Sequence, residues 1–340
     1  MKSIVFKLLK TILPLCLGVY LVWYFFNAMD QKTKAYFYSV IQRADYRWII
    51  ASLILSIFAF FSRAYRWKFM LEPLGYKTSF WNRYHSIMIG YIINLTIPRA
   101  GEASRAAMLL KSDGVPFAKS FGTIIAERAV DFFMLLIVAG TTALFGTQNF
   151  VSIFHEIETK LGVKSEASAG MPSWKIGIII FICLCSLIAF LILYFKPEIR
   201  KKLVGIIKDL SEGILSIFKC KNPLAYIFHT CAIWILYITY FGICFLALDE
   251  TKDFPLSGIL LGFIAGSLGI IFTNGGVGAF PLLIGLVVNL ILGDKTPNAL
   301  AIGNAIGMII WVSQTGILIL LGLLSLFLIP KNFNKEHVAP

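Results

Sequence analysis

The chain contains several long apolar stretches without a charged residue, and these stretches limit its possible folds more than any other feature. Residues 254–293, for example, hold no Asp, Glu, Lys or Arg. The whole chain is 58% hydrophobic and only 14% charged, whereas a soluble domain carries about 25% charged residues. Helices of water-soluble proteins do not tolerate such stretches. The sequence therefore excludes a soluble enzyme, a disulfide-stapled secreted domain and a disordered protein, and it predicts an integral membrane protein.

Six stretches are long and apolar enough to cross a membrane as helices, which takes about 20 residues each. These stretches are residues 11–27, 47–67, 120–146, 174–195, 225–248 and 299–329. The fold class that they predict is an all-α polytopic membrane protein. We expect a single integral membrane domain over residues 1–340, made of two halves (1–146 and 174–329), and no soluble domain.

Two further apolar regions are interrupted near their middle. Residues 84–110 are broken by Pro98 and Gly101, and residues 254–293 by an Asn-Gly-Gly-Val-Gly run at 274–278. Each piece of about 14 residues would be about 20 Å long as a helix, which is too short to cross a bilayer comfortably. We predict two re-entrant helical hairpins, although residues 254–293 are also consistent with two short full spans.

The distribution of basic residues predicts which side each loop faces. When the N-terminus is placed in the cytoplasm, the cytoplasmic segments hold Lys and Arg in an excess of about two to one. Both termini are then cytoplasmic, and the two hairpins enter from opposite sides. The halves are therefore inverted relative to each other, as in inverted-repeat transporters. This count includes Arg63 and Arg66 among the charges of the cytoplasmic segments.

The segment 196–222 combines apolar and basic residues in a helical pattern. Its apolar residues recur at steps of three and four, while Lys201, Lys202 and Lys208 occupy other positions around the helix. This pattern is typical of an amphipathic helix that lies along a membrane surface. We therefore expect residues 196–222 to contact the anionic cytoplasmic leaflet.

Six charged residues remain at the level of the membrane, all in the first half of the chain. They are Arg99, Glu102, Arg105, Glu127, Arg128 and Asp131. A charge at the bilayer centre costs from about 3 to more than 10 kcal/mol. Three cations and three anions sum to zero, so we predict a compensating cluster that faces a polar interior. A static salt-bridge network that only fastens the first hairpin is the alternative.

The spacing of these charges suggests their roles. Glu127 and Asp131 are four residues apart and share one helix face. We predict that Arg99 and Arg105 offer forked donors to a phosphate, and that the three acidic residues hold the arginines when no substrate is bound. The helix that begins near Gly101 would point its N-terminal N–H groups into the same site.

The second hairpin carries no charge but holds a cluster of helix-breaking residues. At its tip, backbone N–H and C=O groups can reach a substrate. The residues concerned are Asn274, Gly275, Gly276 and Gly278. The Gly303-x3-Gly307 spacing instead predicts close packing of helices.

The sequence contains no motif that is typical of a soluble hydrolase or nucleotidase. The cysteines lie in apolar runs or in a Lys-rich loop, and the histidines are isolated. No HExxH, GxxxxGK[ST] or GxSxG motif occurs. We therefore predict no catalytic residue, no metal site, no cofactor and no nucleic-acid partner.

Three motifs resemble a known family. They are Asn-Leu-Thr-Ile-Pro-Arg-Ala-Gly-Glu-Ala-Ser-Arg-Ala at 94–106, Ala-Glu-Arg-Ala-Val-Asp at 126–131 and Gly-Gly-Val-Gly at 275–278. These motifs resemble the lysylphosphatidylglycerol synthase transmembrane region, which is also called flippase-like. The resemblance implies a polytopic inner-membrane protein that moves or handles a lipid with a phosphate headgroup. The chain has Phe280-Pro281 where that family often has an acidic residue. We expect no aminoacyl-transferring domain of the kind that follows in full-length synthases, so the resemblance does not imply aminoacyl-lipid synthesis.

These features together predict a lipid translocator. A phospholipid, an aminoacyl-phospholipid or a polyprenyl-phosphate lipid would pass its headgroup through the polar cleft. One alternative is a membrane subunit that partners a separate lipid-modifying synthase. Another is a component of a transferase that attaches a glycosyl or aminoacyl group to a lipid phosphate.

Overall fold

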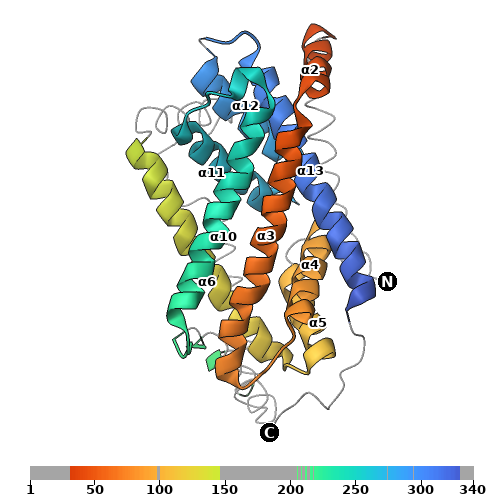
Figure 1. Cartoon of the computed structure of the whole chain (residues 1–340), viewed down its shortest axis with the longest axis vertical. Helices are drawn as coiled ribbons and strands as arrows, with labels where there is room; N and C mark the ends of the chain where they lie inside the picture. The colour runs from red at the N-terminus through yellow and green to blue at the C-terminus, as the bar shows by residue number, and fades with distance from the viewer. Residues whose placement is uncertain are drawn as a thin grey trace, which may run out of the picture.

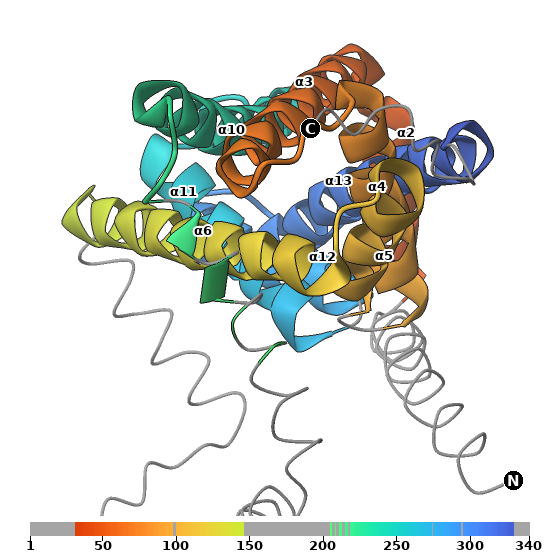
Figure 2. The same ribbon diagram turned by 90° about the horizontal axis from the view of Figure 1, so that it is seen from below.

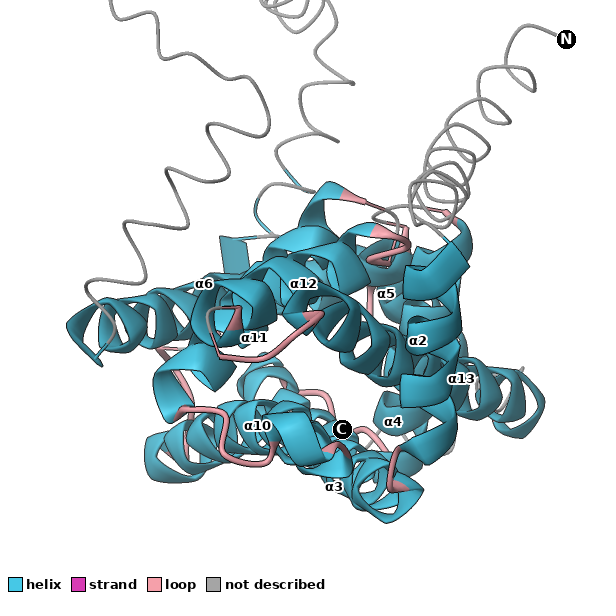
Figure 3. Ribbon diagram, turned by 90° about the horizontal axis from the view of Figure 1, so that it is seen from above, coloured by secondary structure: helices cyan, strands magenta, loops and turns pink. Residues whose placement is uncertain are grey.

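The computed structural model describes residues 31–97, 100–145, 218–273, 275–293 and 295–329, with a few positions between 205 and 216. All of the regular elements in these ranges are helices, as the sequence predicts (Figures 1 and 3). The α-helices are α2 (Gln31–Arg43), α3 (Tyr46–Leu71), α4 (Phe80–Thr96), α5 (Gly101–Asp113), α6 (Phe117–Phe145), α10 (Pro223–Ile243), α11 (Leu256–Phe272), α12 (Ala279–Leu292) and α13 (Ala299–Leu328). The short 3₁₀ helices are η1 (Glu72–Leu74), η2 (Cys244–Ala247) and η3 (Asp249–Thr251).

Three helical stretches are long and apolar enough to cross a membrane. They are Tyr46–Leu74, Pro223–Ala247 and Ala299–Leu328, and they coincide with three of the predicted spans. Helix α6 follows a fourth prediction, 120–146, and has 29 residues. The predicted spans 11–27 and 174–195 lie outside the described residues, as does most of the predicted amphipathic helix 196–222.

Two pairs of shorter helices occupy opposite halves of the molecule. Helices α4 and α5 pack against each other in the lower half of Figure 1, and α11 and α12 do so in the upper half. These helices have 17, 13, 17 and 14 residues, or about 20–26 Å each, against about 45 Å for α13. Between α11 and α12 the backbone takes positive φ angles at Gly275, Gly276 and Gly278. Glycine adopts such angles without the steric cost that a side chain brings.

Helix α13 packs along both helix pairs. A Cβ atom built on Gly303 would lie 2.6 Å from Val288 Cβ of α12. One built on Gly322 would lie 2.8 Å from Ile92 Cβ of α4. Glycines at these positions therefore let the helix backbones approach closely, as the Gly303-x3-Gly307 spacing predicts.

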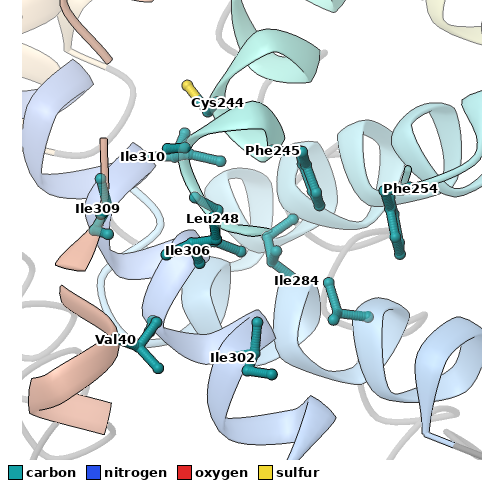
Figure 4. Packing of buried hydrophobic residues seen from close by; sticks show 14 of the residues in the cluster. Val40, Cys244, Phe245, Leu248, Phe254, Ile284, Ile302, Ile306, Ile309 and Ile310 are labelled. Carbon is teal, nitrogen blue, oxygen red and sulfur yellow. The ribbon is translucent and has the colours of Figure 1, made fainter. Parts of the chain in front are cut away.

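Two large hydrophobic clusters fill the halves of the bundle, and a smaller third one joins α6, α10 and α11. Figure 4 shows the upper cluster, in which Ile302, Ile306 and Ile310 of α13 lie four residues apart on one face and meet residues from η2 and α12. Helix α2 adds Phe37 and Val40 to this cluster. The lower cluster joins α3, α4, α5 and α6. Helix α3 lies beside α10 in the views from below and above (Figures 2 and 3), and α5 lies beside the end of α6 in the view from below (Figure 2).

Candidate functional site

Three helices bring five charged side chains together inside the bundle. Arg63 and Arg66 are three residues apart on α3, Glu127 and Asp131 are four apart on α6, and Arg105 lies on α5. Each spacing places its pair on one helix face. The Asp131 side chain is 14% exposed, and the other four are at most 5% exposed. We call these five residues the charge cluster.

Glu127 is the centre of the charge cluster because its carboxylate contacts all three arginines. Its Oε1 lies 3.0 Å from Arg63 Nε and 2.9 Å from Arg66 Nη2, and its Oε2 lies 2.8 Å from Arg105 Nη2. Asp131 adds contacts of 3.1 Å to Arg63 Nη2 and 2.9 Å to Arg66 Nη2. Helix α6 therefore holds α3 and α5 through charge-assisted contacts.

Neutral groups hold the guanidinium groups in place. On α10, Tyr237 Oη accepts from Arg63 Nη1 at 3.1 Å and Thr230 Oγ1 accepts from Arg66 Nη1 at 3.3 Å. The Arg105 guanidinium lies 3.7 Å from the centre of the Trp67 ring, an arrangement that attracts a cation to the ring face. The positions of the arginines are thus fixed from α3, α5, α6 and α10.

The charge cluster is not electrically neutral. Three guanidinium groups meet two carboxylates, which leaves one positive charge in excess. In addition, the buried Nε atoms of Arg66 and Arg105 donate to no protein acceptor among the described residues. A buried, unbalanced charge is costly for a folded protein. The charge cluster can therefore gain stability from an anionic ligand.

A small cavity lies next to the charge cluster. Its volume is about 10 Å³, close to what one water molecule needs. A phosphate group does not fit without movement of the surrounding helices. The lining residues are Arg63, Ile87, Gly90, Tyr91, Asn94, Gly101, Glu102, Arg105 and Arg128.

The first turn of α5 forms part of this cavity and is held tightly by α4. The Gly101 amide donates to Asn94 Oδ1 at 2.7 Å. A Cβ atom on Gly101 would lie only 2.2 Å from the Gly90 carbonyl oxygen. The side chain of Asn94 thus accepts from one of the N–H groups that the sequence analysis assigned to a phosphate. The N–H groups of Glu102 and Ala103 also lie in the first turn of α5, where a helix offers no intrahelical acceptor.

The turns of the two helix pairs meet each other. A Cβ atom on Gly275 would lie 2.8 Å from Leu95 Cδ2, near the end of α4. Trp311 Nε1 of α13 donates to the Gly275 carbonyl at 2.7 Å. Gly276 and Gly278 are buried in the same turn. Two of the predicted site residues, Arg99 and Asn274, lie outside the described residues.

The residues that form the charge cluster differ from the six that the sequence predicts. Arg105, Glu127 and Asp131 lie together, as expected from their sequence spacing. Glu102 and Arg128, however, pair with each other beside the charge cluster, with Arg128 Nη2 3.3 Å from Glu102 Oε1. The predicted sum of zero does not hold for the described residues, because the prediction left out two arginines.

Those two arginines are Arg63 and Arg66, which the sequence analysis counted among the cytoplasmic loop charges. The count was wrong because both residues belong to α3 and face inward, with exposures of 4% and 0%. A signal for them exists in the sequence. Two acidic residues on one face of a membrane helix need cations, and Arg63 and Arg66 share a face at the end of an apolar stretch.

Comparisons with known proteins place the chain in a membrane-protein family. A UPF0104 membrane protein of Methanocaldococcus jannaschii is 33% identical over 99 residues, which are 27% of this chain and 30% of that protein. A UPF0104 membrane protein of Pyrococcus horikoshii is 27% identical over 129 residues, which are 37% of this chain and 36% of that protein. Each alignment thus spans well under two thirds of the relative's own length, and no solved structure matches the chain. Residues 11–315 match the family described as lysylphosphatidylglycerol synthase TM region, so this multi-pass membrane protein belongs to that family.

Proposed function

We propose that this protein translocates a lipid with a phosphate headgroup, either a phospholipid or an aminoacyl-phospholipid. The headgroup would pass through the polar interior at the charge cluster, while the acyl chains stay in the bilayer. The observation that carries this proposal is the excess positive charge of three buried guanidinium groups beside a cavity. Guanidinium groups bind phosphate through forked, charge-assisted hydrogen bonds. The family membership supports a lipid-related role.

We further propose that the pairs α4–α5 and α11–α12 are re-entrant hairpins that enter from opposite sides of the membrane. Their short helices, their places in opposite halves and the contact between Leu95 and Gly275 support this reading (Figure 1). Inverted-repeat transporters bind substrate near the midplane, where such discontinuous helices meet. The two halves would be inverted relative to each other, with both termini in the cytoplasm.

A transferase and a subunit of a separate synthase are the two other candidate functions, and each would give a different experimental result. A transferase needs a base or a metal, but both carboxylates of the charge cluster are occupied by arginines. Among the described residues, no three His, Cys, Asp or Glu side chains come together as metal ligands. Product formation from a labelled donor in isolated membranes would favour a transferase. Co-purification with a separate synthase would favour a subunit role.

The translocation proposal predicts that Arg105→Met slows lipid movement. We expect the rate for headgroup-labelled phosphatidylglycerol in liposomes to fall at least about tenfold, the loss of about 1.4 kcal/mol of phosphate binding. The protein should still fold, because without Arg105 the two remaining arginines balance the two carboxylates.

Arg47→Met is the matched control, since the Arg47 side chain is 88% exposed and pairs only with Asp45 among the described residues. This variant should keep the wild-type rate. Normal translocation by folded Arg105→Met would remove the phosphate role of the charge cluster. A wild-type protein that moves no phosphate-headgroup lipid at all would contradict the proposed function itself.

A further inference from the structure

The cavity beside the charge cluster has one rim that reaches the protein surface. Of the four charged residues that line it, Arg63 and Arg105 are buried. The side chains of Arg128 and Glu102 are 44% and 26% exposed. Arg128 comes from α6 and Glu102 from the first turn of α5, and these two helices lie side by side (Figure 2). The rim therefore lies between α5 and α6.

Arg128 is a cation on an otherwise apolar surface. The exposed hydrophobic residues nearest to it along α6 are Ile125, three residues before it, and Phe132, four residues after it, and Leu136 follows one turn later. In a bilayer, an apolar face of this kind meets acyl chains. An arginine on such a face extends its guanidinium toward phosphate groups at the membrane interface, while its methylenes stay in apolar surroundings. Side chains on a helix also lean toward its N-terminus, here toward Phe117.

The contact between Arg128 and Glu102 is the longest among these charged groups. It measures 3.3 Å, whereas the ion pairs of the charge cluster measure 2.8–3.1 Å. It is also the least buried of these contacts, since both of its side chains are partly exposed. Glu102 is thus the acceptor that an incoming anion can replace most easily.

We propose that Glu102 and Arg128 form a side gate through which a lipid phosphate reaches the charge cluster. The phosphate would replace Glu102 on Arg128, open the space between α5 and α6, and move on to Arg105 and Arg63. This inference rests on the proposed function and adds the route and the first contact of the lipid. Glu102 then competes with the lipid, and Arg128 recruits it.

The two roles predict opposite effects on the association rate of a short-chain, headgroup-fluorescent phosphatidylglycerol, measured in detergent by stopped flow. Glu102→Gln removes the competitor and should speed association about two- to fivefold, which corresponds to about 0.4–1 kcal/mol. Arg128→Gln removes the recruiting charge and should slow association about tenfold.

The exchanged variant, Glu102→Arg with Arg128→Glu, separates a gate from a structural pair. It restores the ion pair but places a negative charge on the exposed face of α6, so association should stay slow. A structural pair predicts the reverse, namely that both single variants bind more slowly and that the exchange restores the rate. Slower association in Glu102→Gln, or full recovery in the exchanged variant, would overturn the gate.

Binding and translocation are measured separately, so the two proposals fail in different ways. If wild-type protein moves no lipid in liposomes but the association rates follow the predicted order, the side gate stands as a lipid-phosphate site and the translocation proposal fails. If wild-type protein moves lipid and the predicted order is absent, only the gate fails. Arg47→Gln serves as the charge-matched control and should leave the association rate unchanged.

Discussion

Replacing Glu127 with glutamine is expected to lower the free energy of unfolding by about 3–5 kcal/mol, the usual cost of removing one partner from a buried ion pair. The variant keeps the shape of the side chain but leaves three buried arginines with Asp131 as the sole carboxylate in the charge cluster. Glu127 contacts each of these arginines within 3.0 Å. In a thermal melt of the detergent-solubilised protein, the midpoint should fall by about 10 °C.

Two further variants test the cause of this loss. Glu72→Gln removes a half-exposed carboxylate that pairs with Lys68 and should shift the midpoint by no more than about 2 °C. Adding Arg105→Met to Glu127→Gln removes one of the unbalanced charges and should restore part of the stability. If Glu127→Gln melts like the wild type, the charge cluster does not have the buried geometry described above.

Replacing Gly101 with alanine is expected to disrupt the packing of α4 against α5. The new Cβ atom would lie 2.2 Å from the Gly90 carbonyl oxygen and 2.5 Å from Asn94 Cγ. The oxygen belongs to the backbone and cannot move without moving α4, so we expect a loss of about 3 kcal/mol or more. The same thermal melt measures this loss, and lipid binding should fall with it because Gly101 lines the cavity.

Gly140→Ala provides the matched control for this prediction. Gly140 lies inside α6, and no atom outside its own turn lies within 4 Å of a Cβ atom built there. Alanine in a helix interior is favoured over glycine by about 1 kcal/mol, so this variant should be as stable as the wild type or more stable. A Gly101→Ala protein that melts and binds lipid like Gly140→Ala would show that α4 and α5 are not packed at this point.

The helices of the described part of the chain were predictable because their signals are local. A long run of apolar residues identifies α3, α10 and α13 without any knowledge of their neighbours. The turn between α11 and α12 was also predictable, because four breakers within 274–278 exclude a continuous helix. Whether these helices re-enter the membrane depends on the position of the bilayer, which no local signal gives.

The candidate site was predictable only in part, because its pairing depends on how helices face one another. Glu127, Asp131 and Arg105 stand out since charge is rare in apolar helices. Arg63 and Arg66 lie near the end of α3, where hydropathy does not distinguish an arginine that reaches into water from one that turns inward. The same reason explains why the excess charge and the contact between Asn94 and Gly101 appear only in the structure.

The central claim is that buried arginines at membrane level bind a lipid phosphate, and a cryo-electron microscopy structure in phosphatidylglycerol nanodiscs tests it most directly. We expect the charge cluster to lie within the hydrocarbon layer, which is about 30 Å thick. We also expect a lipid phosphate within about 3 Å of the Arg105 or Arg63 guanidinium. A structure that places Gly101 in bulk water, away from Glu127, or that shows lipid headgroups only at the two membrane surfaces would contradict the account.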